Sequence, residues 1–290
     1  MVTITIFTPT YNRADLLPRL YDSLCNQTCK DFEWLIVDDG SQDDTECVVN
    51  KFVEDNIFSI RYYKKSNGGK HTAVNLGVQK ALGELFFIAD SDDFLPLDAV
   101  ALVKEQWASV KGGDHEADFG GVCGLDGYAD GRLVGSGLPQ DIIDASYTEI
   151  RSKYGITGDM KEVYRTEVMR EFPFPEIQGE RFCPEALVWN RIAKMYKLRY
   201  FNRIIYVAEY QSDGITAGIT RARMKNPIAT MMTYFEWFGL DVPISQKVRS
   251  AINYWRFAFC AKERTVKIAS WGKLLAPIGY IMHLRDKRHQ

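Results

Sequence analysis

The stretch of sequence that decides the fold is LFFIADSDD, residues 85–93. Five uncharged residues are followed at once by three carboxylates within four positions, Asp90, Asp92 and Asp93. A short apolar run that ends in turn-forming residues is typical of a buried strand. Carboxylates gathered at the end of a buried strand are costly without a counter-charge, and a divalent cation with oxygen ligands would supply one. An acidic cluster that caps a helix is the alternative interpretation.

The same alternation of apolar run and turn occurs three times before this stretch. Strand-like runs lie at residues 2–7, 32–37 and 58–63, and apolar residues at helical spacing follow each of them. Strand and helix therefore alternate four times within the first 95 residues, which predicts βαβ units and a parallel sheet with helices on both faces. The loops that follow the strands would then share one edge of the sheet, where α/β folds bind ligands.

Three further loops on the predicted edge carry residues that suit a ligand. They are TPTYNR at residues 8–13, DDGS at 38–41 and NGGKH at 67–71. Considered singly, each also fits an ordinary proline turn, Asx turn or flexible turn. Glycines and a lysine before a helix suit a phosphate or a base edge, although the spacing matches neither the P-loop nor the dinucleotide fingerprint. Because all these loops are expected on one edge, a common ligand site is the favoured interpretation.

The rest of the chain is less regular. The pattern predicts a helix near 97–109, a strand near 119–123, a helix near 184–196 and a strand at 204–210. From Pro227 onward three amphipathic helical patterns follow one another, the third with Pro277 inside it. We therefore expect a catalytic domain over residues 1–220 and a helical extension over residues 221–290.

Composition excludes several classes of protein. The chain has 290 residues, 46% of them hydrophobic, with 36 Lys and Arg against 38 Asp and Glu. This balance argues against a disordered chain, a collagen-like fibre and a nucleic-acid partner recruited by overall charge. No apolar run approaches the ~20 residues that span a bilayer, and the N-terminus lacks a signal-peptide pattern. The six cysteines show no metal or disulfide spacing, so reduced thiols and a cytoplasmic location are expected.

The loop motifs together resemble the family 2 glycosyltransferases with the GT-A fold. The resemblance rests on residues 8–13, 37–41, 67–69 with Asn75 and Gly77, and 90–93, in that order. It implies a GT-A-type, Rossmann-like, mostly parallel sheet flanked by helices. It also implies a metal-dependent inverting transfer of a sugar from a nucleotide sugar, usually a UDP-sugar, to a hydroxyl acceptor, in the assembly of cell-surface polysaccharide or glycolipid. The metal, Mg²⁺ or Mn²⁺, would be held by the Asp-x-Asp motif.

The resemblance also assigns roles to individual residues. Asp39 would contact the base, Asp90 would face the ribose, and Asp92 would ligate the metal, with Asp93 able to share that role. The complete set expected to bind the nucleotide sugar is Thr8, Tyr11, Arg13, Asp39, Lys70, Asp90 and Ser91.

A catalytic base is expected near the start of the helix predicted at residues 184–196. Family members usually have a Glu-Asp pair there with an Arg six residues after the Asp. Arg191 is in register, so Glu185 takes the position of the base and Pro184 replaces the usual Glu. Proline is tolerated at the start of a helix. Glu180 is the rival base, and a first-turn carboxylate that merely complements the helix dipole is the other alternative.

The acceptor is expected to be a saccharide or a lipid-linked molecule, and residues 124–137 and 210–220 are candidate acceptor or lid loops. Residues 221–290 hold 13 basic and four acidic side chains, whereas the rest of the chain has a net charge of −11. A basic amphipathic segment at residues 271–290 is compatible with a peripheral contact at the inner membrane face or with packing on the protein body. The aromatic stripes of residues 228–259 are compatible with a core or with the face of a homodimer. Two other functions stay open, a nucleotidyltransferase and a nucleotide-sugar-binding protein without turnover.

Overall fold

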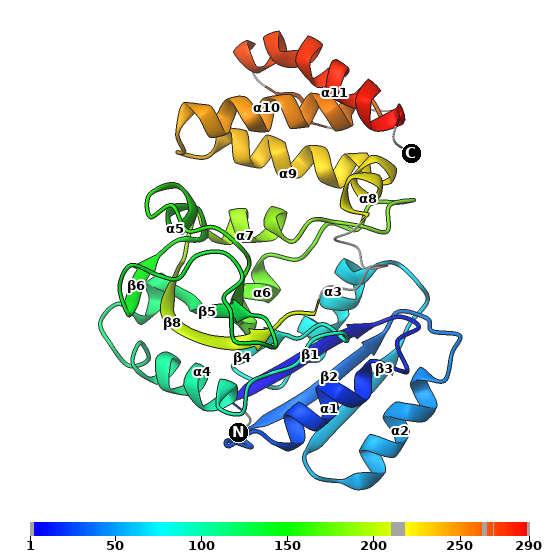
Figure 1. The fold of residues 1–290 in the computed structure, drawn as a ribbon, viewed down its shortest axis with the longest axis vertical. Coiled ribbons are helices and arrows are strands. Elements are labelled where there is room, and N and C mark those ends of the chain that lie inside the picture. The colour runs from blue at the N-terminus through cyan, green and yellow to red at the C-terminus, as the bar shows by residue number, and fades with distance from the viewer. Residues whose placement is uncertain (1–2, 210–217, 263–265, 269, 289–290) are drawn as a thin grey trace. The chain divides into compact units, whose positions relative to one another are not determined.

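The computed structural model describes residues 3–209, 218–262, 266–268 and 270–288. Its central element is a mixed eight-stranded sheet with the strand order β3-β2-β1-β4-β7-β5-β8-β6 (Figure 1). In chain order the strands are β1 Ile4–Thr10, β2 Phe32–Asp38, β3 Ser59–Lys64, β4 Leu85–Ile88, β5 Phe119–Gly127, β6 Ile142–Ala145, β7 Met160–Arg165 and β8 Lys197–Val207.

The four strands predicted within the first 95 residues are all present and mutually parallel. β1 pairs with β2 and β4, and β2 pairs with β3. β1 and β2 are buried at every position, and most of their residues are apolar, with Glu33 and Asp38 as the only charged side chains. The predicted parallel sheet is confirmed over this half. β7 and β6 run antiparallel to their neighbours, and the sequence did not predict either of them.

Helices cover both faces of the sheet. α1 (Leu17–Cys25), α2 (Thr45–Asp55) and α4 (Ala99–Ala108) share one apolar core with the even-numbered residues of β1, such as Ile4 and Ile6. α3 (Lys70–Lys80) packs on the opposite face, where Phe7 points. A Cβ on Gly77 would lie 2.2 Å from the ring of Phe7, so a glycine is required for this close approach. α3 is thereby held with its first residue at the carboxyl edge of the sheet.

The chain forms two compact units. The first comprises residues 1–173 and 192–209 and contains the sheet; the second comprises residues 174–191 and 210–290. The first unit also contains α5 (Tyr147–Ser152), α6 (Thr166–Glu171) and the 3₁₀ turn η1 (Glu116–Asp118). The division at residue 220 expected from the sequence stays a prediction for the functional domains, although residues 174–191 group with the C-terminal helices.

The second unit is built from short helices. They are α7 (Ala186–Ile192, whose last residue groups with the sheet), α8 (Ile219–Lys225), α9 (Pro227–Gly239), α10 (Ile244–Ala258), the 3₁₀ turn η2 (Ser270–Leu275) and α11 (Ala276–Arg288). Met231, Phe238, Ala251 and Tyr254 form the core between α9 and α10. Pro277 is the second residue of α11, where its missing N–H costs nothing, and does not lie inside the helix as predicted. Within the described part of the chain, no helix is both long and apolar enough to cross a bilayer.

Two boundaries differ from the prediction. The helix predicted at 184–196 is shorter, and the strand predicted at 204–210 begins at Lys197. The first half of β8 alternates charged and apolar residues, which hides it from a search for apolar runs. All six cysteines are free, as predicted.

Candidate functional site

The carboxyl ends of four parallel strands place the predicted loops on one edge of the sheet. Thr10 at the end of β1 is in register with Asp38 at the end of β2, and Asp38 is in register with Lys64 at the end of β3. β4 is aligned with β1, so the loop after Ile88 begins beside Phe7. The predicted convergence of the loops is confirmed.

Asp39 organises the glycine loop that leads into α3. Its Oδ1 accepts hydrogen bonds from the Lys65 ammonium at 2.7 Å and from Gly68 N–H at 2.9 Å, and its Oδ2 accepts one from Gly69 N–H at 2.7 Å. Gly69 has a φ of +95°, a conformation that favours glycine. A carboxylate has about four lone-pair positions. Three are used within the chain, and one on Oδ2 remains for a ligand donor.

Asp38 and Asn12 join the loops after β1 and β2. Asp38 accepts hydrogen bonds from Ser41 N–H at 2.7 Å and from the Tyr62 hydroxyl at 2.6 Å, and burial together with this carboxylate raises the pKa of Tyr62. Ser41 Oγ in turn accepts a hydrogen bond from Asn12 N–H at 2.8 Å. The Asn12 side chain accepts another from Gln42 N–H at 2.8 Å. These bonds hold the two loops in a fixed geometry around Asp39.

Lys70 connects the Asp39 end of the edge with the acidic loop after β4. It is the first residue of α3, directly after the Gly69 that Asp39 binds. Its ammonium forms an ion pair with Asp90 at 2.6 Å. Burial alone would raise the pKa of Asp90, but the charges of Lys70 and Lys161 outweigh it and lower that pKa. Asp39, Gly69, Lys70 and Asp90 therefore form a continuous chain of contacts along one edge.

Asp92 and Asp93 differ in how they are used. Asp93 accepts hydrogen bonds from the Tyr206 hydroxyl at 2.7 Å and from Glu209 N–H at 2.8 Å, so both its oxygens anchor β8. Asp92 is held by its backbone carbonyl, which accepts a hydrogen bond from Arg19. Among the described residues the Asp92 carboxylate has no ion-pair partner. Burial and the charge of Asp90 raise the pKa of Asp92, and they raise that of Asp93 to about 6.

This arrangement fits a hard divalent cation. Mg²⁺ and Mn²⁺ sites use one or two protein carboxylates and take their other ligands from water and phosphate oxygens. Asp92 is partly exposed and short of a counter-charge, with Asp90 next to it. No group of three or more acidic, histidine or cysteine side chains is preformed for a metal among the described residues. Asp92, with Asp90 beside it, could therefore supply one or two carboxylate ligands to such an ion.

The remaining predicted donor residues lie in contrasting environments. Tyr11 is 46% exposed at the end of β1, and Ser91 is buried in the turn after β4. Thr8 is completely buried within β1, and its hydroxyl accepts a hydrogen bond from the Trp34 indole at 2.9 Å. Its contact with a nucleoside stays a prediction. Arg13 lies close enough to Asp92 to lower the pKa of that carboxyl, against the larger effects of burial and Asp90.

Sequence reasoning missed a polar group on β5 and β7. Asp126 on β5 is 5% exposed, and its Oδ1 has no hydrogen-bond partner among the described residues. Burial raises the pKa of Asp126 to about 7, and the charge of Lys161 on β7 partly offsets this. The Lys161 ammonium lies 3.5 Å from the centre of the Tyr206 ring. Only the unpredicted strand β7 and the pairing of β5 with β8 bring these side chains together, so local sequence held no signal for them.

The two candidate bases, Glu180 and Glu185, have different partners within the second unit. The Glu180 carboxylate accepts hydrogen bonds from Ile228 and Ala229 N–H at 2.6 and 2.8 Å. It therefore caps the N-terminus of α9, where a negative charge is stabilised by the free amides. Glu185 directly precedes α7, and its carbonyl accepts the first hydrogen bonds of that helix. Arg191 forms an ion pair with Glu236 at 3.2 Å.

The candidate acceptor loops are described in part. Residues 124–127 belong to β5, and a turn at 128–132 follows them. Residues 210–217 of the second loop lie outside the described residues. The role of this loop as an acceptor or lid loop stays a prediction.

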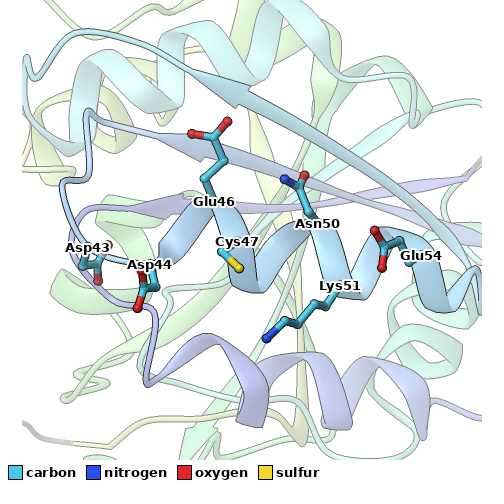
Figure 2. Close-up of a pocket in the computed structure, with 7 residues that line it drawn as sticks. All are labelled: Asp43, Asp44, Glu46, Cys47, Asn50, Lys51 and Glu54. Atoms are coloured by element: carbon cyan, nitrogen blue, oxygen red, sulfur yellow. The ribbon is translucent and has the colours of Figure 1, made fainter.

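A surface pocket of about 590 Å³ lies along α2 and the turn before it (Figure 2). It holds none of the predicted donor residues. One exposed helix side provides almost all of its lining, and we assign no ligand to it. The lining residues are Asp43, Asp44, Glu46, Cys47, Asn50, Lys51 and Glu54.

Comparison with known sequences finds a family model that matches the N-terminal part of the chain. Residues 5–109, which contain every loop of the carboxyl edge, match the family model Glycosyl transferase family 2. The N-terminal part of the chain is similar to the family 2 glycosyltransferases. Over 241 residues this glycosyltransferase is 27% identical to a GalNAc(5)-diNAcBac-PP-undecaprenol beta-1,3-glucosyltransferase of Campylobacter jejuni; the match covers 81% of this chain and 73% of the relative. It is also 40% identical to a chondroitin synthase of Pasteurella multocida, over 37% of this chain and 11% of that protein.

Solved structures share the fold of this glycosyltransferase. The crystal structure of Staphylococcus aureus TarS 1–349 in complex with UDP matches with a TM-score of 0.61 at 19% identity, over 88% of this chain and 70% of that one. The mannosyltransferase PcManGT from Pyrobaculum calidifontis, in complex with GDP-Man and Mn²⁺, matches with a TM-score of 0.59 at 16% identity, over 99% and 75% of the two chains. The predicted GT-A-type fold with a helical C-terminal part is confirmed.

Proposed function

We propose that this glycosyltransferase moves a sugar from a UDP-sugar to a hydroxyl group of a saccharide or lipid-linked acceptor, with inversion and with the help of Mg²⁺ or Mn²⁺. The observation that carries the proposal is the contact chain from Asp39 through Gly69 and Lys70 to Asp90, which ends beside the unpaired Asp92 carboxylate. A UDP complex, a GDP-Man complex with Mn²⁺ and a relative that acts on an undecaprenol-linked glycan support the chemical class.

The nucleoside would lie at the Asp39 end of this edge. The remaining lone pair of Asp39 can accept an N–H of the base, and the exposed Tyr11 ring offers a surface for stacking. Thr10 is a further candidate, because its hydroxyl is buried at the end of β1 and lacks a partner among the described residues. Lys70 would pair with the diphosphate as well as with Asp90. Its charge lowers the pKa of Asp90 and so keeps that carboxylate ionised.

Bond cleavage needs positive charge beside the leaving diphosphate. A divalent ion held by Asp92 and shared with Asp90 would neutralise the charge that develops there. The bond between the anomeric carbon and the phosphate oxygen breaks with its electron pair on the diphosphate, and the acceptor oxygen bonds to the opposite face of the carbon. Glu185 would take the proton of the acceptor hydroxyl. Glu180 is the weaker candidate for this step, since both its oxygens already bind the amides of α9.

Thermal shift with a donor panel tests the proposal. UDP-glucose, UDP-N-acetylglucosamine, UDP-N-acetylgalactosamine and GDP-mannose are each added with Mn²⁺ and with a chelator, and release of the nucleoside diphosphate is followed in parallel. We expect a UDP-sugar to raise the melting temperature in the presence of metal and Asp39→Asn to weaken that shift. Release of UDP must stop when the metal is chelated. Metal-independent turnover, or stabilisation by none of the donors, would overturn the proposal.

A further inference from the structure

The outer side of η2 and α11 carries an apolar face. We define the outward face as Trp271, Leu274, Ile278, Ile281 and Leu284, which recur at helical spacing. Leu274 is 79% exposed, Ile281 66% and Ile278 46%. Exposed apolar residues are ordinary when scattered singly, but a continuous stripe of them marks a surface for a partner. We propose that the outward face docks this protein on the surface of an anionic lipid bilayer.

The packing of the opposite side fixes which residues point outward. Gly279 and His283 are buried against α10, and a Cβ on Gly279 would lie 2.5 Å from the Cβ of Trp255. Asp286 accepts two hydrogen bonds from the Arg256 guanidinium of α10, at 2.5 and 2.7 Å. The close contact of Gly279 with Trp255 and the two hydrogen bonds between Arg256 and Asp286 fix the orientation of α11 on α10. The apolar stripe is therefore a stable feature of the surface.

Basic side chains flank the outward face. Lys273 is exposed between Trp271 and Leu274, and Arg285, Lys287 and Arg288 are exposed after the last apolar residue of the stripe. The single acidic side chain of α11, Asp286, is neutralised by Arg256. Basic side chains are attracted to an anionic membrane surface, and the apolar residues between them can enter the headgroup region. Apolar surface and positive charge are thus combined on one side of one element.

The same charges argue against a second copy of the chain as the occupant. An antiparallel pairing of two outward faces would bring Lys273 of one copy close to Arg288 of the other. A parallel pairing would bring the three basic residues of the last turn together. Like charges in such contacts are destabilising. α11 has 13 residues and is about 20 Å long, which is too short to cross the ~30 Å core of a bilayer, so it would lie in the plane of the surface.

Vesicle flotation tests this inference without any nucleotide sugar. The full chain is mixed with phosphatidylcholine vesicles or with vesicles that also contain about 30% phosphatidylglycerol. We expect flotation with the anionic vesicles, and a loss at high salt because the electrostatic attraction is screened. The triple variant Leu274→Ser, Ile278→Ser, Ile281→Ser should bind at least about tenfold more weakly. The matched control is Leu82→Ser, Ile57→Ser, Ile244→Ser, which changes equally exposed side chains elsewhere and should float like the unchanged chain.

A charge variant separates lipid from protein as the partner. Lys273→Glu with Lys287→Glu should weaken flotation and leave a concentration-dependent dimer, if one exists, unweakened. Failure of the unchanged chain to float, or equal flotation of both triple variants, overturns the inference. A dimer in light scattering that the outward-face triple dissociates would also overturn it, because the face would then belong to a second copy. UDP release by the outward-face triple should be unchanged, so failure here is distinguishable from failure of the donor proposal.

Discussion

The carboxyl edge of the sheet and the outward face of α11 are both surfaces for a partner, but they differ in how the chain prepares them. At the edge, backbone and side-chain hydrogen bonds fix almost every polar group around Asp39 before any ligand arrives. On α11 the outward residues make few contacts, and the opposite side of the helix does the positioning through Gly279 and Asp286. A directional ligand needs fixed donors and acceptors, whereas a lipid surface needs only area and charge.

The largest effect is expected at Asp92. Asp92→Ala removes the carboxylate that lacks a counter-charge and should lower sugar transfer by about 100-fold or more, since the leaving diphosphate loses its compensating cation. Transfer is measured as release of UDP with saturating Mn²⁺, with circular dichroism to show that the fold is retained. The exposed Asp114→Ala is the control and should keep full activity. Undiminished transfer by Asp92→Ala would contradict the proposal that Asp92 holds a catalytic cation at the carboxyl edge.

The next effect concerns the helix that presents Lys70 to the edge. Gly77→Val would force a side chain into the ring of Phe7 and should lower the free energy of unfolding by about 3 kcal/mol. Because α3 would be displaced, donor affinity should fall together with stability. Chemical denaturation and thermal shift with UDP measure the two quantities. Gly239→Val is the control, since nothing lies within 4 Å of a Cβ there and its φ is outside the left-handed region.

A pH dependence is expected from Glu162 on β7, behind the edge. Burial raises the pKa of this carboxyl to about 8, against an ordinary value of 4.5. The folded state therefore holds a proton that the unfolded state releases, so stability falls as the pH rises from about 4.5 to about 8. Glu162→Gln should remove this loss and stabilise the protein at about pH 7 by on the order of 2 kcal/mol, with little effect at about pH 4.5. Equal melting temperature gains at both pH values would contradict this explanation.

The smallest effect is expected on α11. Asp286→Ala removes the ion pair with Arg256, which is partly buried, and should destabilise the docking of this helix by about 1 kcal/mol. Hydrogen exchange should become faster in α11, while β1 and β2 keep their protection. The double variant Arg256→Met, Asp286→Leu should restore much of the loss, because it leaves no unpaired charge behind. Unchanged exchange in Asp286→Ala would mean that Gly279 alone positions the outward face.

Local sequence predicted β1, β2 and β4 because a strand buried on both faces is rich in apolar residues. β3 is only partly buried, and its β-branched and aromatic residues predicted it. The same rule missed β7, where Lys161 and Glu162 interrupt the pattern, and β6, which has only four residues. The edge loops were predicted as a group because parallel strands end on the same side. The sequence predicted Pro277 inside the last helix, whereas it is the second residue of α11. Spacing alone does not show where a helix begins.

Site residues followed a similar division. Asp39, Asp90 and Asp92 stand in loops after strands and Lys70 begins the helix after β3, so strand order alone predicted that they lie on one edge. Their roles in binding stay predictions. Asp126 comes near Asp90 and Asp93 only through the pairing of β5 with β7 and β8, which local sequence does not encode. Likewise, the sequence offered Glu180 and Glu185 as rival bases, and only the hydrogen bonds to α9 distinguish them.

By itself, the sequence determined the parallel half of the sheet and the edge on which the acidic loops meet, because hydrophobic periodicity and strand direction act over short stretches of chain. The tertiary structure decided which polar atoms are already used, which carboxylate is left without a partner and which side of α11 faces outward. Those outcomes depend on contacts between residues far apart in the chain, such as Asp39 with Gly69 and Arg256 with Asp286. No local pattern records such contacts, because each partner is chosen by the packing of whole elements.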